Sequence, residues 1–553
     1  MNKVKKMALG LFSVATICCI GAFASCSTGS PYNGYSSEES SEEEKIDAKE
    51  LVLGTASVDN LASADEDDWF KFTIPADGYI TIDFTHTKIN SSATNWKIHL
   101  YESDGSTNYA GGDFNWGVTG KEDYSTPTLG IAAGDYYIKI TDENVSYNNQ
   151  WSDVEYNLTV NYTEASDWET EINEGAENAN ALKVNEVKKG SLVKSWDDDW
   201  YKFTIAADGY ITIDFTHTKI NSSATTWKIH LYESDGFTGY AGEDFNWGVI
   251  GKEDYSTPTL GIAAGDYYIK ITDENVSYNN QWSNVEYNLI VNYTEASDWE
   301  TEINEGSENA NALKVNEVKN GSIVKSWDYD WYKFTIPADG YITIDFTHTK
   351  INSSATTWKI YLYESDGFTL CEDDNAIWSV SGSDDYQTRK IGVLAGDYYI
   401  KITDENVSYN NHWSDVTYNL KIKFVNDNTW EIESNDSSGK ANTVVNMRKG
   451  YLENSSDVDW YKVYIGSYTN VVLLFNHNYV DTSSVCWKVT VYSSDAITEL
   501  IQIDIKGNQT GEEATFNTTS SGYYYIKVAK GSYNIWQGGY NSSTAEYNFS
   551  ILA

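Results

Sequence analysis

The residues best suited to chemistry in this chain are acidic and occur in two motifs that repeat. The first motif, WETEIN or WEIESN, holds two glutamates two positions apart and then an asparagine, and it occurs at 168–173, 299–304 and 430–435. The second motif holds two aspartates two positions apart, and it occurs as WDDDW at 196–200, WDYDW at 327–331 and SDVDW at 456–460.

These paired carboxylates suit the binding of a hard cation. An extended segment places residues i and i+2 on the same side, so the two carboxylates of each motif point together. If the two motifs of one copy meet in the fold, four carboxylates share one place and cannot all stay ionised without compensation. A cation with about six to eight oxygen ligands, such as Ca²⁺, would compensate them. The alternative is a pair of solvated acidic turns that never meet.

A second candidate site consists of aromatic residues in loops between the last two strands expected in each copy. Flat rings beside Asn, Asp and Gln suit stacking against sugars or prolines, and exposed aromatics often anchor interfaces. The sequence therefore predicts ligand binding by Tyr147, Trp151, Tyr278, Trp282, Tyr409, Trp413, Tyr533 and Trp536. Another aromatic loop holds Phe114 and Trp116, with Phe245 and Trp247 in the next copy. The alternative is that these rings cap the ends of the core.

Other residue types with catalytic or metal-binding potential form no coherent set. His99 recurs as His230, but the third copy has Tyr361 there, so we expect solvated surface rather than a zinc site. Cys371 and Cys486 occur in different copies and indicate no shared disulfide framework. The sequence has no GxSxG, HExxH or nucleotide-binding loop, and we predict that the protein is not an enzyme.

The motifs lie in a passage that occurs four times. Trp69, Trp200, Trp331 and Trp460 mark equivalent positions, spaced by about 130 residues, whereas solenoid repeats span about 20–50 residues. A copy of this length can bury its own core. The first three copies are nearly identical, and the fourth has diverged.

Apolar and polar residues alternate within each copy, as β-strands require. The pattern is clear in YITIDFT (79–85), WKIHLY (96–101), DYYIKIT (135–141) and EYNLTVNY (155–162). The sequence predicts an all-β chain of four tandem antiparallel β-sandwich (jelly-roll-like) domains after a signal peptide and an acidic tether. The expected segments are the signal at 1–26, the tether at 27–45, and sandwiches at 46–165, 166–297, 298–425 and 426–553.

The first 26 residues predict an export signal, because three lysines precede an apolar run that is short for a membrane span. FASC ending at Cys26 is typical of a bacterial lipobox; cleavage after Ala24 is the alternative. The Ser- and Glu-rich tether should be disordered. The net charge of −44 argues against nucleic acid and against an anionic membrane surface, so we expect membrane contact only through a lipid on Cys26.

Three segments of the fourth copy resemble the bacterial pre-peptidase C-terminal domain: IESNDSSGKAN (432–442), SSDVDWYKVYI (455–465) and SGYYYIKV (521–528). That module is a jelly-roll-like β-sandwich related to the collagen-binding domains of clostridial collagenases. The resemblance covers 167–553 and, with a divergent start, 45–165. It implies calcium where the linker meets the sandwich. Carried over by position, the ligands would be Glu169, Glu171, Asn173, Asp197, Asp199, Glu300, Glu302, Asn304, Asp328, Asp330, Glu431, Glu433, Asn435, Asp457 and Asp459.

These observations predict a non-catalytic, monomeric lipoprotein on the bacterial outer membrane or cell surface, with secretion as the alternative. Its four modules would bind an extracellular glycan or matrix protein with the avidity that multivalency confers, and calcium would rigidify the linkers. Two other functions stay open: a structural stalk or spacer without a ligand of its own, and an accessory module protein of a secreted peptidase system.

The lipid anchor is tested by Cys26→Ala, which should release the protein from membranes or leave it unprocessed because the acylated thiol is absent. Fractionation and mass spectrometry of the mature N-terminus provide the measurement. Cys18→Ala is the control, since that residue leaves with the signal. An unlipidated mature N-terminus at Ser25 in the parent protein would contradict the prediction.

Overall fold

The computed structural model describes residues 46–63, 66–111, 114–143, 154–193, 197–220, 223–240, 245–273, 285–324, 328–350, 356–371, 376–404, 416–452, 457–466, 470–531 and 545–552. Strands dominate these residues, and the helical segments among them are short 3-10 turns: η1 (Tyr109–Gly111), η2 (Ala176–Asn178), η4 (Ser307–Asn309) and η6 (Ser438–Lys440). The prediction of an all-β chain is confirmed.

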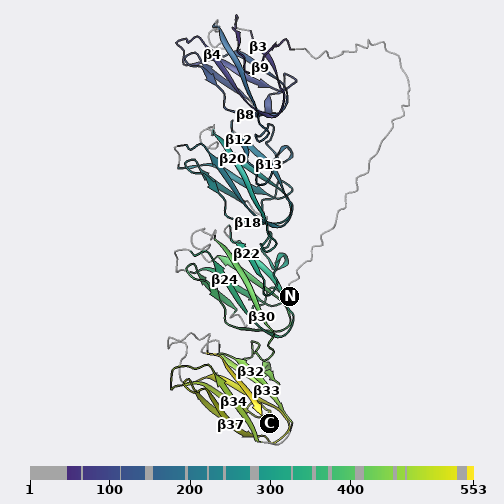
Figure 1. Cartoon of the computed structure of the whole chain (residues 1–553), viewed down its shortest axis with the longest axis vertical. Helices are drawn as coiled ribbons and strands as arrows, with labels where there is room; N and C mark the ends of the chain where they lie inside the picture. The colour runs from purple at the N-terminus through teal and green to yellow at the C-terminus, as the bar shows by residue number, and fades with distance from the viewer. Residues whose placement is uncertain are drawn as a thin grey trace, which may run out of the picture. The chain divides into compact units, whose positions relative to one another are not determined.

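The described strands form four pairs of sheets, each pair a sandwich (Figure 1). The first sandwich comprises β1 (Lys49–Glu50), β2 (Ser57–Asp59), β3 (Asp68–Ile74), β4 (Gly78–His86), β5 (Thr94–Tyr101), β6 (Asn115–Thr119), β7 (Tyr124–Ser125), β8 (Leu129–Ile131), β9 (Gly134–Asp142) and β10 (Tyr156–Glu164). The second comprises β11 (Asn180–Ala181), β12 (Lys188–Ser191), β13 (Asp198–Ile205), β14 (Gly209–His217), β15 (Thr225–Tyr232), β16 (Phe245–Ile250), β17 (Tyr255–Ser256), β18 (Leu260–Ile262), β19 (Gly265–Asp273) and β20 (Glu286–Glu295).

The other two sandwiches follow the same order along the chain. The third comprises β21 (Asn311–Ala312), β22 (Val318–Ser322), β23 (Tyr329–Ile336), β24 (Gly340–His348), β25 (Thr356–Tyr363), β26 (Ile377–Ser381), β27 (Tyr386–Gln387), β28 (Ile391–Val393), β29 (Gly396–Asp404) and β30 (Thr417–Val425). The fourth comprises β31 (Asn442–Val444), β32 (Met447–Gly450), β33 (Val458–Ile465), β34 (Asn470–His477), β35 (Val485–Tyr492), β36 (Glu499–Lys506), β37 (Gly511–Asn517), β38 (Gly522–Lys530) and β39 (Tyr547–Leu552).

The first sandwich shows the topology of the set. One sheet has the order β1-β3-β9-β5-β6, and the other has the order β2-β10-β4-β7 with β8 also paired to β4. The second and third sandwiches repeat both orders, and the fourth has β31-β33-β38-β35-β36 facing β32-β39-β34-β37. The pairs are antiparallel except for one short parallel pair in each sandwich, namely β1 with β3, β11 with β13, β21 with β23 and β31 with β33.

The core lies between the two sheets of each sandwich, on the face that alternation predicts. In β4 the side chains of Ile80, Ile82 and Phe84 are fully buried, whereas Thr81 and Asp83 between them stay partly exposed. Strand pleating sends successive side chains to opposite faces, so one register of apolar residues supplies the whole inner surface of the strand.

The buried apolar residues form four clusters, one for each sandwich. Two clusters recruit a residue from the start of the next sandwich: Val193 joins the first, and Val324 joins the second. The buried members of the third cluster all lie between Leu313 and Ile422. The third sandwich therefore holds a core built from its own strands.

The histidines are less exposed than the sequence led us to expect. His99 is half-buried, its Nε2 lies 3.3 Å from Thr141 Oγ1, and burial lowers the pKa of its imidazole. Because Tyr101 and Lys139 lie beside it on the outer face of the sheet, this polar position is covered rather than solvated.

We expect residues 298–425 to fold cooperatively when produced alone, because the third core needs no residue from its neighbours. Phe346→Ala should lower the free energy of unfolding by about 3–5 kcal/mol, the cost of truncating a fully buried ring. Denaturant titration measures both effects, with Thr343→Ala as the control on the outer face of the same strand. A fragment that becomes ordered only in tandem would contradict the prediction.

Candidate metal centres at the linkers

Each acidic linker motif begins with a tryptophan that packs against the preceding sandwich. The ring centroid of Trp168 lies 4.7 Å from that of Tyr79 on β4, and the equivalent pairs are Trp299 with Tyr210 at 4.6 Å and Trp430 with Tyr341 at 5.3 Å. The next residue joins the following sandwich, since Glu169 N donates to Lys189 O at 2.8 Å. Adjacent side chains of an extended segment point to opposite sides, so the glutamate faces the sandwich that follows.

The carboxylate of Glu169 lies between the two sheets of the second sandwich and is 1% exposed. Its Oε1 accepts a hydrogen bond from Ser191 N at 2.6 Å, and its Oε2 accepts one from the hydroxyl of Tyr201 at 2.8 Å. Tyr201 on β13 and Tyr287 on β20 come from opposite sheets, and their hydroxyl oxygens are 2.6 Å apart. Tyr287 donates in turn to Asp199 Oδ2. One linker residue thus connects both sheets.

The same network recurs in the third and fourth sandwiches. Glu300 accepts from Tyr332 at 2.7 Å, and Tyr418 donates to Asp330. In the fourth, Glu431 accepts from Tyr461 at 2.5 Å, and Tyr547 donates to Asp459.

A glycine lies against the glutamate in the second and fourth sandwiches, and against the tyrosines that hold it in the third. A Cβ atom on Gly190 would lie 2.5 Å from Glu169 Oε2, and one on Gly450 would lie 2.1 Å from Glu431 Oε2. On the other side of the linker, a Cβ on Gly130 of the first sandwich would lie 2.2 Å from Glu169 O. These distances are too short for any side chain, so glycine is required where the linker passes between the sandwiches.

The remaining acidic residues gather beside this network. Carboxylate oxygens of three residues lie within 4.8 Å of one another in each of four groups: Glu171, Glu174 and Asp197; Glu300, Glu302 and Asp330; Glu302, Glu305 and Asp328; Glu431, Glu433 and Asp459. Asp457, which belongs to none of these groups, is buried beside them, and its charge contributes to the raised pKa of Asp459. The two acidic motifs of each copy therefore meet, and they are not separate solvated turns.

Several buried polar atoms at these centres make no hydrogen bond to a described residue. They are both side-chain polar atoms of Asn173 and Asn435, Oδ1 of Asn304, and Oδ1 of Asp199, Asp330 and Asp459. Each of these residues is fully buried. The Asn304 side chain points into its cluster, because its Nδ2 lies 3.5 Å from Glu300 Oε2. Such atoms each cost about 1–3 kcal/mol unless a ligand satisfies them, and oxygen ligands suit a hard cation.

Burial raises the pKa of the carboxyl groups in the clusters. It raises the pKa of Glu169 to about 7 and that of Glu300 to about 8, and the charges of neighbouring aspartates add to the effect. Burial, and then the charge of the linker glutamate Glu169, Glu300 or Glu431, raises the pKa values of Asp199, Asp330 and Asp459 well above the ordinary range. A bound cation would reverse this direction by favouring the ionised forms.

Sequence reasoning missed Glu174 and Glu305, which belong to two of the clusters. The signal was present, because an acidic residue follows the motif's asparagine in all three copies, with Asp436 in the last. It also missed the tyrosines that hold the glutamates. Their signal is the repeated tyrosine in WYK and in EYN, or TYN at Tyr418, although those segments are equally consistent with ordinary strands.

In the first sandwich a lysine lies at the strand position that corresponds to Asn180 of the second sandwich. Lys49 pairs with Phe70 in the register in which Asn180 pairs with Tyr201, so the ammonium occupies the equivalent edge. Its Nζ contacts Asp59 and lies 3.3 Å from Asp68 Oδ1. Burial alone would lower the pKa of Lys49, but the two aspartates raise it.

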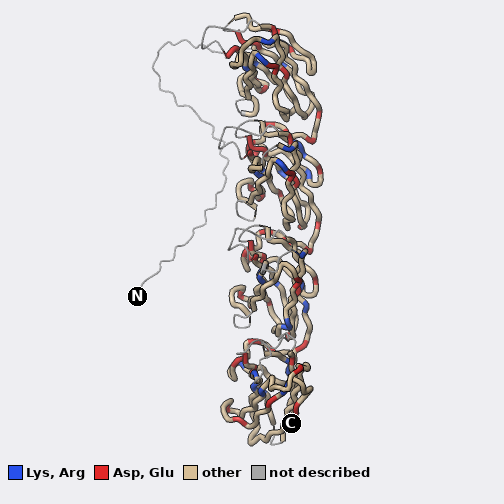
Figure 2. Tube along the Cα trace, turned by 90° about the vertical axis from the view of Figure 1, so that its left-hand side faces the viewer, with Lys and Arg blue, Asp and Glu red and all other residues tan. Residues whose placement is uncertain are grey.

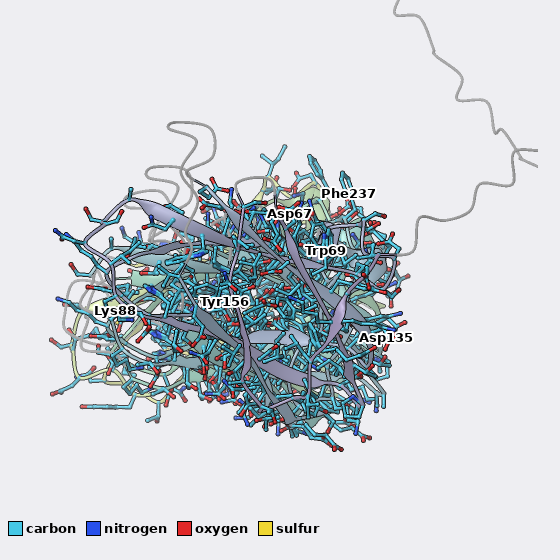
Figure 3. All side chains as sticks on the ribbon, turned by 90° about the horizontal axis from the view of Figure 1, so that it is seen from above. Asp67, Trp69, Lys88, Asp135, Tyr156 and Phe237 are labelled. Carbon is cyan, nitrogen blue, oxygen red and sulfur yellow. The ribbon has the colours of Figure 1, made fainter. Side chains whose placement is uncertain are left out.

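The buried Asp68 also accepts a hydrogen bond from Tyr156 at 2.5 Å, as Asp199 does from Tyr287. Tyr156 lies inside the first sandwich in the view of Figure 3, whereas Lys88 lies at its edge. Glu66 caps the turn at Ala62 and Ser63, where its Oε2 accepts two backbone N–H bonds, so it is not part of this group.

The predicted aromatic ligand-binding residues Tyr147, Trp151, Tyr278, Trp282, Tyr409, Trp413, Tyr533 and Trp536 lie outside the described residues, as does Cys26. The other aromatic loops are described. Phe114, Trp116, Phe245 and Trp247 are at most 8% exposed, and all four belong to the hydrophobic clusters. These four rings complete the core.

Acidic and basic residues are interspersed over the described chain in Figure 2. In the described part of the chain, no helix has the length and hydropathy needed to cross a membrane.

No protein-family model matches the chain, and neither does any curated protein. Among solved structures, the pre-peptidase C-terminal domain of a Bacillus anthracis collagenase is similar over 21% of this chain and 94% of that one, with 18% identity and a TM-score of 0.15. A tandem CBM22 structure from Paenibacillus barcinonensis covers 40% of this chain and 82% of its own, with 9% identity and a TM-score of 0.15. Tandem CBM51 modules from a Streptococcus pneumoniae glycoside hydrolase cover 42% and 83%, with 9% identity and a TM-score of 0.14. These values do not establish a family for the chain.

We expect Lys49→Met to loosen the first sandwich selectively, because it leaves the carboxylates of Asp59 and Asp68 without their cation. The free energy of local opening at β10 should fall by about 1 kcal/mol, because Asp68 is buried but solvent screens the 54% exposed Lys49. Hydrogen exchange of the full chain, resolved by segment, measures this at β10 and at the equivalent β20.

Lys88→Met is the matched control, since its ion pair with Asp123 is exposed and worth about 0–1 kcal/mol. Unchanged exchange at β10 in Lys49→Met, or an equal change at β20, would contradict the role given to Lys49.

Proposed function

We propose that this protein is a non-catalytic, exported binding protein in which Ca²⁺ joins three linkers to the sandwiches that follow them. The observation that carries the proposal is the set of buried carboxylate clusters with unsatisfied asparagine and aspartate oxygens beside them. Each cluster combines residues from a linker, such as Glu302, with residues from a sandwich, such as Asp328. A cation there would hold the linker in place.

The ligand types favour calcium over other metals. The clusters contain carboxylates and amides but no histidine or cysteine among the described residues, which disfavours zinc. Magnesium usually keeps several water molecules, whereas calcium accepts about six to eight oxygens in an irregular protein cage. Glu169, Glu171, Asn173, Asp197 and Asp199 supply such oxygens, with Glu174 added by the structure.

The proposed role of the modules is multivalent binding of an extracellular glycan or matrix protein. Several linked modules raise avidity only when their geometry lets them engage together, and a fixed linker favours this. Export, the lipid on Cys26 and the domain limits at 165, 297 and 425 belong to the same proposal. A stalk without a ligand is the second candidate, and the repetition of nearly identical copies favours it equally.

Calcium should raise the melting temperature of the full chain, because a ligand that binds only the native state stabilises it by about 2.7 kcal/mol at a hundredfold excess over Kd. Asp330→Asn should reduce the heat of binding in a calcium titration, since it removes a carboxylate from one of the two groups at the third linker. Glu308→Gln is the control, because Glu308 is exposed on the same linker. Identical melting with calcium and with chelator would refute the proposal.

The dependence of folding stability on pH provides a second test of the metal centres, and the direction of the effect can be stated. Without a cation, the raised pKa values of Glu169 and Glu300 mean that protonation stabilises the fold. That contribution is complete below the ordinary value of 4.5 and is lost as the pH rises through about 7 to 8. The calcium-free protein should therefore be less stable at pH 8.5 than at pH 5.5, and the stabilisation by calcium should be larger at the higher pH.

A further inference from the structure

The outer face of the fourth sandwich carries a strip of aromatic and basic side chains on two neighbouring strands. In β33 and β38 the outward-facing residues pair in register as Trp460 with Lys527, Lys462 with Tyr525, and Tyr464 with Tyr523. Tyr464 is 61% exposed and Tyr523 is 47% exposed, and their ring centroids lie 5.5 Å apart. We call these six residues the β33–β38 strip.

At the same positions in the second sandwich, the lysines form ion pairs with aspartates. Thr204 stands where the strip has Tyr464, and Asp266 stands where it has Tyr523. The Asp266 carboxylate accepts from Thr204 at 2.6 Å and lies 2.9 Å from the ammonium of Lys202. At the other end of these strands, Lys270 lies 2.7 Å from Asp198. Both lysines are therefore neutralised within the sandwich.

In the first and third sandwiches the lysine equivalent to Lys202 is also paired: Lys71 lies 2.8 Å from Asp135, and Lys333 lies 2.9 Å from Asp397. At the other end of the strands, Lys139 of the first sandwich lies 2.7 Å from Asp67. In the third sandwich Tyr329 takes the place of Asp198, and the ammonium of Lys401 lies 4.0 Å from its ring centroid. Figure 3 shows Asp67, Trp69 and Asp135 along one side of the first sandwich.

The fourth sandwich keeps the lysines but has lost these carboxylates. Tyr523 replaces the aspartate that pairs with Lys202, and Val458 replaces Asp198. Lys462 forms no ion pair with a described residue, and the ammonium of Lys527 lies over the Trp460 ring at 5.6 Å from its centroid. A chain of net charge −44 thus has a local excess of positive charge on an exposed aromatic surface.

The combination of exposed aromatic rings and lysines indicates the class of ligand that the strip binds. A flat open sheet face does not enclose a small molecule, which needs a concave site. Exposed rings instead pack against the apolar faces of sugars, and lysines pair with carboxylate or sulfate groups. The strip residues on β33 run from Trp460 to Tyr464 and span about 13 Å, so the strip suits a short stretch of an extended chain.

We propose that the β33–β38 strip binds an acidic polysaccharide, one whose sugar rings carry carboxylate or sulfate groups. This inference rests on the proposed function of the protein as a binding protein and names its ligand class and its module. The fourth sandwich binds the polysaccharide. The three sandwiches before it do not, because the lysine equivalent to Lys462 is paired with an aspartate in each of them.

The full chain is tested against polygalacturonate, with neutral dextran as the comparison, by affinity electrophoresis and titration. Chelator is present, so that calcium cannot bridge the two polyanions. The double variant Tyr464→Thr with Tyr523→Asp installs the residues of the other three sandwiches and should fold normally. It should weaken binding about tenfold or more, because it removes two rings and neutralises Lys462.

Tyr479→Ser is the control, since Tyr479 is equally exposed, at 61%, and lies outside the strip. The reverse graft, Thr204→Tyr with Asp266→Tyr and Asp198→Val, should create a second site and strengthen binding. Equal affinity of the double variant and the parent, equal affinity for dextran, or no binding of polygalacturonate at low salt would each overturn the proposal.

The calcium centres and the strip share no residue, so the two proposals can fail separately. Asp330→Asn should reduce calcium binding and leave polygalacturonate binding unchanged in chelator. Loss of polygalacturonate binding in that variant would contradict the assignment to the strip, whereas an absent calcium effect in the parent would contradict only the metal centres.

Discussion

One buried carboxylate at each linker is the interaction on which the rest of the junction depends. Glu169, Glu300 and Glu431 each leave the linker, enter the end of a sandwich and accept a hydrogen bond from a tyrosine whose hydroxyl contacts that of a second tyrosine on the opposite sheet. A charge placed there without compensation would be costly, since burial disfavours its ionised form. The glycines around it and the acidic cluster beside it are consequences of that placement.

The first sandwich shows how else the same constraint can be met. Asp68 takes the position of Asp199 and accepts from the equivalent tyrosine, but among the described residues no glutamate takes the place of Glu169 there. The ammonium of Lys49 supplies the positive charge from within the sandwich. The first sandwich therefore places a lysine of the chain beside its buried aspartate, whereas the later sandwiches place there a group of carboxylates that could hold a metal ion.

The fourth sandwich shows which features are kept when the sequence diverges and which features change. Its core, its buried tyrosine pair and its linker glutamate keep the arrangement of the other copies despite the divergence of the sequence. Its outer face has changed, with Tyr464 and Tyr523 in place of an internally paired threonine and aspartate. Exposed strand positions contribute little to stability and can change freely, which makes them the natural place for recognition to diverge.

The sequence by itself determined the all-β architecture and the inward face of each strand, because a period of two along a strand assigns core and solvent sides without further information. It also indicated that the paired carboxylates at 169–171 and 197–199 could converge, since both motifs are extended. It could not identify Tyr287 as a partner, because 118 residues separate it from Glu169.

Only the tertiary structure decided which charges meet. Register and sheet order bring Lys49 to Asp68 and add Glu174 and Glu305 to the clusters. They also place Tyr464 beside Tyr523, where the other sandwiches pair a threonine with an aspartate. These outcomes depend on distances across strands and between sheets. A one-dimensional pattern carries no record of those distances, because the same alternation is compatible with many pairings.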